Sequence, residues 1–470
     1  MRKSFDRHNK WMVFAVTGMA NLVVSFSINS LTLALPLLKD VFGVDQGTVS
    51  WLVVVYSLIP CCTLLILGRT AELFGYKRQF KIGFLFFGLV CLAAPLLSGN
   101  IGILIVFRCL QGLGYSIMIS ITQAIVSRSF GESERGKALG VNSIFVSIGL
   151  AAGPTVGGFL LTYFSWQALF YFNVPFCLLG FLAAWFILPD DTVDAAQNRR
   201  MDLTGVISLA LSIGIIVIAL NFISSPGFMP IPFLCCLIAG AIGLIVFIWH
   251  ELHAASPIMN LKLFRNRTFS LSNTICLTSY LVQQLITYLM PGYLINILLL
   301  RADTAGLMML ASPAFMMIFS PIGGSMADKK GTRLPAGLGI ASIALGCLIM
   351  SFLNESSPFF IIIVVLLLVG TGNGLSVSSI NASIIGSAPA ESAGVASGML
   401  ATMRNLGQTL GVVFGTMILT VRQSAYHNVA ENKAYLFGQR DSYYFGIAVL
   451  AVSLVLVTLL PGKRPGYMAG

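Results

Sequence analysis

Charged side chains are scarce in this sequence. Only 10% of the 470 residues are Asp, Glu, Lys or Arg, whereas a soluble globular domain carries about 25%. There are also only four histidines, and the nine cysteines do not show the paired spacing of a zinc site. The sequence contains no nucleophile–base arrangement, phosphate-binding loop or metal cluster. These shortages exclude most soluble enzymes and predict no catalytic residue, no metal and no cofactor.

Hydrophobic residues, in contrast, make up 57% of the chain, and the mean hydropathy is +0.89. A membrane-spanning helix needs roughly 20 mainly apolar residues, and a window of about 19 residues finds fourteen such segments. They lie near 11–38, 50–67, 80–98, 101–127, 138–162, 168–188, 203–223, 231–250, 269–292, 304–326, 334–353, 358–386, 393–420 and 443–460. We therefore expect an all-α polytopic membrane protein with fourteen transmembrane helices, surrounded by a lipid bilayer.

The positions of the basic residues predict the orientation. The net charge of +11 would suggest nucleic-acid binding in a soluble protein, but in a membrane protein the side on which Lys and Arg lie matters more. With the N-terminus in the cytoplasm, 21 of the 28 Lys and Arg lie on the inner side and five on the outer side. This asymmetry predicts a multi-pass protein of the cell membrane with both termini in the cytoplasm and no nucleic-acid partner.

The two halves of the chain share three blocks of residues at a nearly constant offset. The pattern G-x3-acid-x2-G-x-basic recurs after 256 residues, in Gly68, Glu72, Gly75 and Lys77 and in Gly324, Asp328, Gly331 and Arg333. A glycine block recurs after 258 residues, in Gly136, Gly140, Gly149 and Gly153 and in Gly394, Gly398, Gly407 and Gly411. Gly112 and Gly114 pair with Gly372 and Gly374. Three blocks in the same order indicate an internal repeat.

Each repeat contains six predicted spans, and an even number gives both repeats the same orientation in the membrane. We expect an N-terminal six-helix bundle over residues 1–190, a linker with two extra transmembrane helices over 191–268, and a C-terminal six-helix bundle over 269–470. Two like bundles that rock about a central site form a transporter for a small-molecule substrate, which we expect to work as a monomer.

The stretch from Gly68 to Arg78 resembles the cytoplasmic loop motif of the major facilitator superfamily. The resemblance implies that fold, and it implies a charge network that holds the inward-closed arrangement. Glu72 and Arg78 are able to pair and separate as the bundles move. The residues implied in gating are Gly68, Glu72, Gly75 and Arg78, with Asp328 and Arg333 of the second repeat. The alternative is a solvated loop that follows the positive-inside rule.

A second stretch resembles the fifth-helix motif that the superfamily associates with antiporters. It contains Gly149, Gly153, Pro154, Gly157 and Gly158. Glycines at every fourth residue share one helix face and let another helix approach closely, while Pro154 frees a backbone carbonyl and permits a bend. The resemblance implies antiport, and the alternative is helix packing with no influence on the direction of transport.

Arg108 belongs to a segment, L-x3-R-x2-Q-G-x-G, that resembles the fourth-helix motif of the superfamily. The family links this arginine to proton coupling. A charge inside the bilayer costs at least about 2.5 kcal/mol, so Arg108 is a candidate for proton coupling or charge relay. It lies seven residues from the outer end of its span, roughly 10 Å deep. The alternative is that its side chain extends to the membrane surface.

The fourteen-span layout, residues 166–175 and residues 394–407 narrow the resemblance to the drug:proton antiporter branch with fourteen helices, the multidrug efflux type linked to drug resistance. Members of this branch usually carry an aspartate in the first helix, before a terminal Ala-Leu-Pro. That tripeptide is present at 34–36, but Ser27 stands in the place of the aspartate. The sequence therefore departs from the branch at the residue that usually exchanges the proton.

None of the 17 acidic residues falls well inside a predicted span, whereas Arg108 and Arg404 do. Arg404 lies about eleven residues into its span, roughly 16 Å deep. Arginines without carboxylates disfavour a buried cationic substrate and favour an anionic or zwitterionic one. The alternative is that backbone carbonyls hold Arg404 and that it serves packing. Asp40 and Asp303, near outer span ends, are the remaining candidate proton carriers.

Polar residues inside the spans are candidates for the substrate cavity, although some will only bridge helices. The candidates are Ser27, Asn29, Gln111, Asn142, Gln284, Tyr288, Asn373 and Arg404. Together the observations predict a secondary active exporter of amphipathic small molecules by alternating access, with drug/proton antiport. The alternative is a dedicated exporter of an anionic or zwitterionic metabolite or lipid-like compound. A membrane enzyme, a receptor or a channel would not require the paired six-helix repeats.

Overall fold

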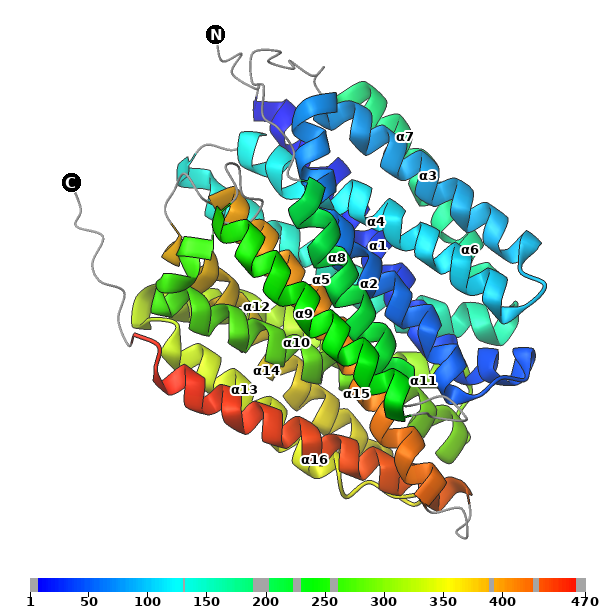
Figure 1. Cartoon of the computed structure of the whole chain (residues 1–470). Helices are drawn as coiled ribbons and strands as arrows, with labels where there is room; N and C mark the ends of the chain where they lie inside the picture. Colours follow the sequence, from blue (N-terminus) through cyan, green and yellow to red (C-terminus); the bar gives the residue numbers. More distant parts are fainter. Residues whose placement is uncertain are drawn as a thin grey trace.

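The computed structural model describes residues 7–129, 132–188, 203–222, 230–253, 261–388, 393–425 and 431–461. These residues form helices and no strand (Figure 1). The helices are α1 (Arg7–Phe42), α2 (Gln46–Phe74), α3 (Tyr76–Leu97), α4 (Ile101–Ser129), α5 (Glu132–Tyr163), α6 (Ala168–Tyr171), α7 (Asn173–Ile187), α8 (Leu203–Phe222), α9 (Pro230–His253), η1 (Leu261–Arg265), α10 (Arg267–Gly292), η2 (Tyr293–Ile297), α11 (Ala302–Met309), α12 (Ala311–Lys330), α13 (Arg333–Met350), α14 (Phe359–Ser387), α15 (Ala393–Ala425) and α16 (Glu431–Thr458).

The fourteen predicted spans are confirmed. Eleven segments of the described residues are long and apolar enough to cross a membrane. The short apolar helix α8 and the more polar helices α10 and α15 supply the other three. Two spans are each broken into two helices, α6 with α7 and α11 with α12. The protein is therefore an all-α membrane protein with two six-helix bundles and two inserted helices.

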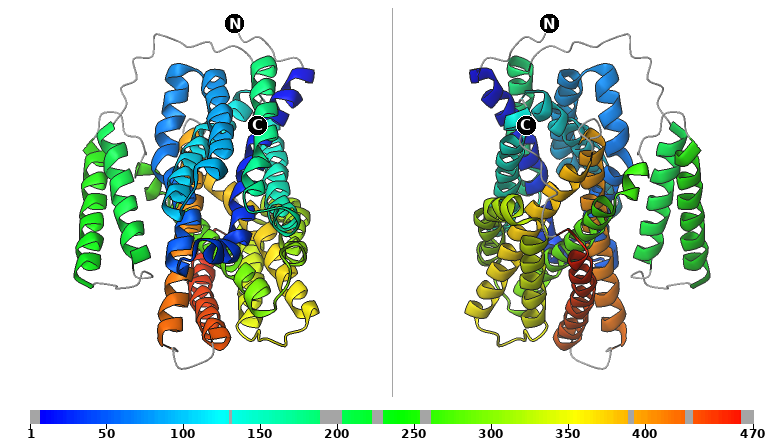
Figure 2. Two further views of the ribbon diagram at one scale, coloured as in Figure 1. Left: turned by 90° about the vertical axis from the view of Figure 1, so that its right-hand side faces the viewer. Right: turned by 90° about the vertical axis from the view of Figure 1, so that its left-hand side faces the viewer.

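The two bundles repeat the same packing. In the first, α5 packs on α1, and α4 packs on both α2 and α3. In the second, α15 packs on α10, and α14 packs on both α12 and α13. The inserted helices α8 and α9 lie side by side at the edge of the molecule (Figure 2) and pack against each other. The helix α8 also contacts α2 and α15. The internal repeat of the sequence is thus a repeat of helix neighbours.

The repeated glycines make close helix contacts in each bundle. In α5, a Cβ at Gly149 would lie 2.7 Å from the carbonyl oxygen of Leu22 in α1. In α15, a Cβ at Gly407 would lie 2.5 Å from the carbonyl oxygen of Leu277 in α10. Gly153, Gly157, Gly411 and Gly415 continue these two contacts at the same spacing. Because a Cβ cannot approach a backbone oxygen this closely, these glycines set the distance between the helices.

We expect Gly411→Ala to destabilise the protein, because its new methyl group would meet the carbonyl of Leu281. An overpacked core position costs about 1–3 kcal/mol. The thermal transition of the purified protein should shift down by a few degrees. Gly214→Ala in α8 is the matched control, since nothing lies within 4 Å of a Cβ there. Equal transition temperatures for both variants would contradict the proposed role of these glycines.

The structure corrects the pairing of the glycines in α4 and α14. Gly112 lies against α2, and its equivalent is Gly370, which lies against α12. Gly114 lies against α3, and its equivalent is Gly372, which lies against α13. The sequence pairing of Gly112 and Gly114 with Gly372 and Gly374 is therefore wrong by two residues. It failed because α14 has three glycines at alternate positions, which fit two registers equally well.

The repeated loop motif forms the same turn in both halves. Gly75 ends α2 with φ +96°, and Gly331 ends α12 with φ +86°. Residues with a Cβ avoid this backbone region, so glycine is needed at both positions. Each glycine N–H donates to the carbonyl four residues earlier, Ala71 at 3.0 Å and Ala327 at 3.1 Å.

The helix α16 begins twelve residues before its predicted span at 443, and it includes Asp441. The prediction that no acid lies well inside a span is wrong here, because the helix continues through a polar segment that a hydropathy window excludes. Asp441 pairs with Arg422 of α15 at 2.6 Å and lies 3.6 Å from Arg440. Arg422 is 18 residues from Arg404, roughly 27 Å along α15, so this ion pair is remote from the interior arginine.

Candidate transport site between the two halves

Arg108 lies in α4 and is fully buried. Its Nε donates to the carbonyl oxygen of Leu52 in α2 at 2.8 Å. Its Nη1 donates to Gln111 Oε1 at 2.7 Å and to Ser27 Oγ at 3.3 Å. The guanidinium carbon lies 4.0 Å from the centre of the Tyr56 ring. The side chain is thus enclosed by α1, α2 and α4 and does not extend to the membrane surface.

Every described partner of the Arg108 guanidinium is electrically neutral, and Nη2 has no hydrogen-bond partner among the described residues. Removing a cation from water costs several kcal/mol, and the Tyr56 ring offsets about 2 kcal/mol of this when desolvated. Ser27, the residue in the place of the missing aspartate, is one of the neutral partners. Ser27, where the sequence departs from the branch pattern, is therefore in direct contact with the buried arginine.

Two stacked tyrosines connect Arg108 with the second half. The ring centroids of Tyr56 and Tyr115 are 5.6 Å apart, and the stacked ring planes are inclined by 28°. The Tyr115 hydroxyl donates to Asn405 Oδ1 at 3.0 Å, and Arg404 Nη2 donates to the same hydroxyl at 3.4 Å. We call Arg108, Tyr56, Tyr115 and Arg404 the arginine–tyrosine bridge. It passes from α4 through α2 and back to α4, and then to α15 of the other half.

Arg404 differs from Arg108 in its exposure. It lies eleven residues after the start of α15, and its side chain keeps some accessible surface, whereas the adjacent Asn405 is fully buried. In the described part of the chain, its hydrogen bond goes to Tyr115 and not to a backbone carbonyl. None of the ion pairs of the described residues includes it. Arg404 is therefore the interior cation with surface available to a ligand.

The two halves are tightly closed at one end. In Figure 1, α1 begins at the top and α16 ends at the left, and we call the opposite end of the helices the far face. There, Gly158 of α5 lies against the carbonyl of Ala302, and Gly306 of α11 lies against the carbonyl of Pro154. The backbone N–H of Asp303 also donates to Thr162 Oγ1 at 3.0 Å. The predicted antiporter motif thus contacts the second half directly, through α11.

A second contact between the halves lies at the start of α2. Gln46 is the first residue of that helix, and its Nε2 donates to the hydroxyl of Tyr288 in α10 at 2.6 Å. Tyr288, predicted to line the cavity, is buried in this contact. The helices α2 and α15 also pack against each other, as α5 does with α11. The described contacts therefore correspond to an arrangement that is closed at the far face.

Three other predicted cavity residues are buried at different places. Asn29 donates to the carbonyl of Ser25 in its own helix at 3.0 Å and lies against Gly153, which is a packing role. Gln284 Nε2 in α10 and Asn373 Oδ1 in α14 are buried without a hydrogen-bond partner in the described part of the protein. These two amides are buried polar groups of the second half whose hydrogen-bonding capacity the described residues do not use fully.

Some predicted residues lie away from the interior. Asp40 is exposed near the end of α1, at the far face. Asn142 and Glu72 fall outside the described side chains. Of the predicted gating residues, Gly68 is partly exposed, whereas Arg78, Asp328 and Arg333 are exposed beside the two repeated turns. The structure does not bring this group into contact with the arginine–tyrosine bridge.

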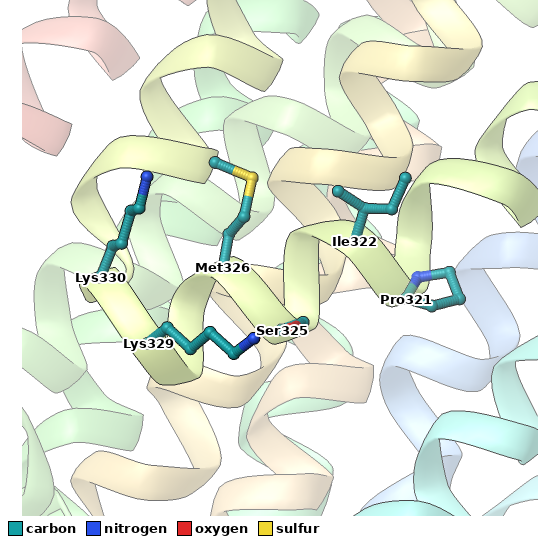
Figure 3. A pocket seen from close by; sticks show the side chains of 6 residues that line it. All are labelled: Pro321, Ile322, Ser325, Met326, Lys329 and Lys330. Carbon is teal, nitrogen blue, oxygen red and sulfur yellow. The ribbon is translucent and has the colours of Figure 1, made fainter.

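A surface hollow of about 360 Å³ lies beside the second repeated turn. Figure 3 shows that its side chains come from one helix, α12. They are Pro321, Ile322, Ser325, Met326, Lys329 and Lys330. Because the hollow includes none of the four bridge residues, it is separate from the interior site.

Sequence reasoning missed Tyr56 of the arginine–tyrosine bridge and three residues that contact the other half, Tyr115, Gln46 and Gly306. For Tyr115 a signal existed, because it follows Arg108 by seven residues and two helical turns place both side chains on one face. No comparable signal exists for Gln46 or Gly306, which follow loops and contact the other half.

Comparisons with known proteins agree with this architecture. The family model described as Major Facilitator Superfamily matches residues 17–412 and 273–467. The riboflavin transporter RibZ of Clostridioides difficile is 28% identical over 460 residues, which cover 97% of this chain and 98% of that protein. The multidrug resistance protein Stp of Mycobacterium tuberculosis is 30% identical over 411 residues, covering 87% and 75%. A crystal structure of a D-xylose–proton symporter matches with a TM-score of 0.68 at 14% identity, covering 97% and 98%.

Proposed function

Because the chain belongs to the Major Facilitator Superfamily, we propose that it is a secondary active exporter that moves amphipathic small molecules by alternating access. One observation carries this proposal. The two like halves meet tightly at the far face, while Arg404 keeps accessible surface about a third of the way along α15. A central site that is sealed from one side is what one of the two states of an alternating-access transporter requires.

We further propose that it works as a monomer in the cell membrane, with both termini in the cytoplasm. The excess of basic residues on the side of the termini supports this orientation. The far face is then the outer face, and residues 191–268 join the bundles formed by 1–190 and 269–470. Cargo enters from the cytoplasm and leaves after the far-face contacts of α5 with α11 have opened.

Proton antiport is the coupling that the antiporter motif favours, and the names of relatives such as Stp favour a drug-like cargo. The test is transport in proteoliposomes with an imposed pH gradient. Riboflavin is a suitable first probe because it is fluorescent and because the relative RibZ is named a riboflavin transporter. We expect the gradient to drive accumulation of a transported probe. A transported probe whose flux ignores the gradient would exclude proton antiport, and a panel without any transported compound would contradict the exporter itself.

A second candidate is a dedicated exporter of an anionic or zwitterionic compound. It is favoured by Arg404, which is partly accessible and whose hydrogen bond within the described residues is a long one to a neutral hydroxyl. A carboxylate or phosphate on the cargo would form shorter, charge-assisted bonds with this guanidinium. Riboflavin and its 5′-phosphate differ only in that anion, so stronger competition by the phosphate in the same assay would support this candidate. Equal competition would contradict it.

A further inference from the structure

We propose that Tyr115 is a positioning residue that couples Arg404 to Arg108, so that an anionic group bound in the second half alters the contacts of the buried cation in the first. The inference rests on the proposed function, because it takes Arg404 as the group that meets the cargo. It assigns a role to the two tyrosines of the bridge that neither the repeats nor the sequence motifs explain.

The Tyr115 hydroxyl uses both of its hydrogen-bonding capacities on the second half. It donates its proton to Asn405 Oδ1 at 3.0 Å and accepts from Arg404 Nη2 at 3.4 Å. The second bond is near the upper limit for a hydrogen bond. A carboxylate or phosphate at Arg404 would form shorter bonds, about 2.7–2.9 Å, and would displace the phenol oxygen. Tyr115 is therefore an internal ligand that an anion replaces.

The ring of Tyr115 is fixed on the first half. It is almost fully buried and stacks on Tyr56, which is itself fully buried and donates its hydroxyl proton to the carbonyl of Val24 at 3.3 Å. The Tyr56 ring also contacts the guanidinium of Arg108. A displacement of Tyr115 is therefore transmitted to the ring that stabilises this cation.

Because no carboxylate is among the described neighbours of Arg108, the interaction of its guanidinium with the Tyr56 ring is sensitive to the position of that ring. Its described partners are a carbonyl, an amide, a hydroxyl and the Tyr56 ring. A change in the ring position changes the stability of the first half, since no nearby negative charge dominates the balance. The bond from Tyr115 to Asn405 can persist while the bond to Arg404 is lost, so the halves stay linked as the cargo binds.

Three variants test the coupling, with turnover and KM measured for an anionic dye in proteoliposomes. Tyr115→Phe keeps the stacked ring and removes the hydroxyl. It should lower KM by about threefold, because Arg404 loses its internal competitor, and should lower turnover by about tenfold, because the link to Asn405 and Arg404 is broken. A general structural defect would not lower KM.

The other two variants change Tyr56, which contacts neither Arg404 nor Asn405. Tyr56→Leu removes the stacked ring and should lower turnover by about tenfold. Tyr56→Phe keeps the ring, so its turnover should stay within about threefold of that of the unmodified protein. This pair separates the loss of the ring from the loss of a hydroxyl group.

Unchanged turnover in Tyr115→Phe would overturn the inference, as would equal turnover in Tyr56→Leu and Tyr56→Phe. If Tyr56→Leu does not fold, the turnover of Tyr115→Phe alone tests the inference, because phenylalanine has nearly the same shape as tyrosine. If the unmodified protein carries no anionic dye, the anionic-cargo proposal fails rather than the coupling alone. The two failures are distinguishable, since both turnover comparisons require an unmodified protein that transports the dye.

Discussion

Arg404→Gln should largely abolish transport of anionic cargo while leaving the protein folded. Removing one partner of a buried charge interaction costs about 2–5 kcal/mol, which corresponds to a loss in kcat/KM of about 30-fold to several thousand-fold. The glutamine amide retains a donor for Tyr115, so the substitution removes the charge and leaves a polar group of similar size. Flux of a fluorescein carboxylate dye into proteoliposomes measures the effect.

The matched control for this substitution is Arg265→Gln. Arg265 ends η1, is exposed and lies outside the arginine–tyrosine bridge. Its loss removes one positive charge from the protein without changing the interior, so kcat/KM for the dye should stay within about twofold. An equal loss in both variants would mean that net charge, and not the site, determines transport. An unchanged kcat/KM in Arg404→Gln would exclude Arg404 as the anion contact.

Arg108→Met should stabilise the protein and at the same time stop transport. Arg108 is a fully buried cation with neutral partners, and replacing buried charges by apolar side chains of similar volume often stabilises a protein by about 1–4 kcal/mol. Leaving Gln111 without its donor offsets about 1 kcal/mol of this. The melting temperature of the purified protein in detergent should therefore rise by a few degrees, although the residue predicted to act in coupling is gone.

Arg108→Lys is the comparison that separates charge from shape. It keeps the buried cation but loses the planar fork of donors that reaches Leu52 and Gln111, and the flat contact with Tyr56. It should therefore melt below the unmodified protein, in the direction opposite to Arg108→Met. If Arg108→Met is less stable than Arg108→Lys, the burial of the Arg108 charge does not destabilise the protein, and this explanation is wrong.

Much of the fold could be predicted from sequence, because membrane spans and repeats leave simple patterns. Hydropathy locates apolar helices, and the spacing of Gly149 and Gly153 and of Gly407 and Gly411 specifies a helix face that a neighbour approaches. The two turns at Gly75 and Gly331 are predictable for a similar reason, since only glycine tolerates their backbone conformation. These features depend on residues close together in the chain.

The site was only partly predictable, because it depends on contacts between distant segments. Arg108 and Arg404 stand out as charges in apolar spans, and Ser27 was singled out by the missing acid. Which arginine keeps accessible surface, however, depends on neighbours from α1, α2 and α4. Tyr115 could have been found from its spacing of seven residues after Arg108, whereas Tyr56 gave no comparable signal, since aromatic residues inside a span are common. The extent of α16 was missed because a helix can continue through residues that are too polar for a hydropathy window.

The central claim is that the interior site recognises negative charge through an arginine with neutral neighbours. The most direct measurement is the Kd of the purified, unmodified protein for two dyes that share one ring system, an anionic fluorescein and a cationic rhodamine. The account predicts that the anionic dye binds at least about tenfold more tightly, a difference of about 1.4 kcal/mol. Equal Kd values, or tighter binding of the cationic dye, would contradict it.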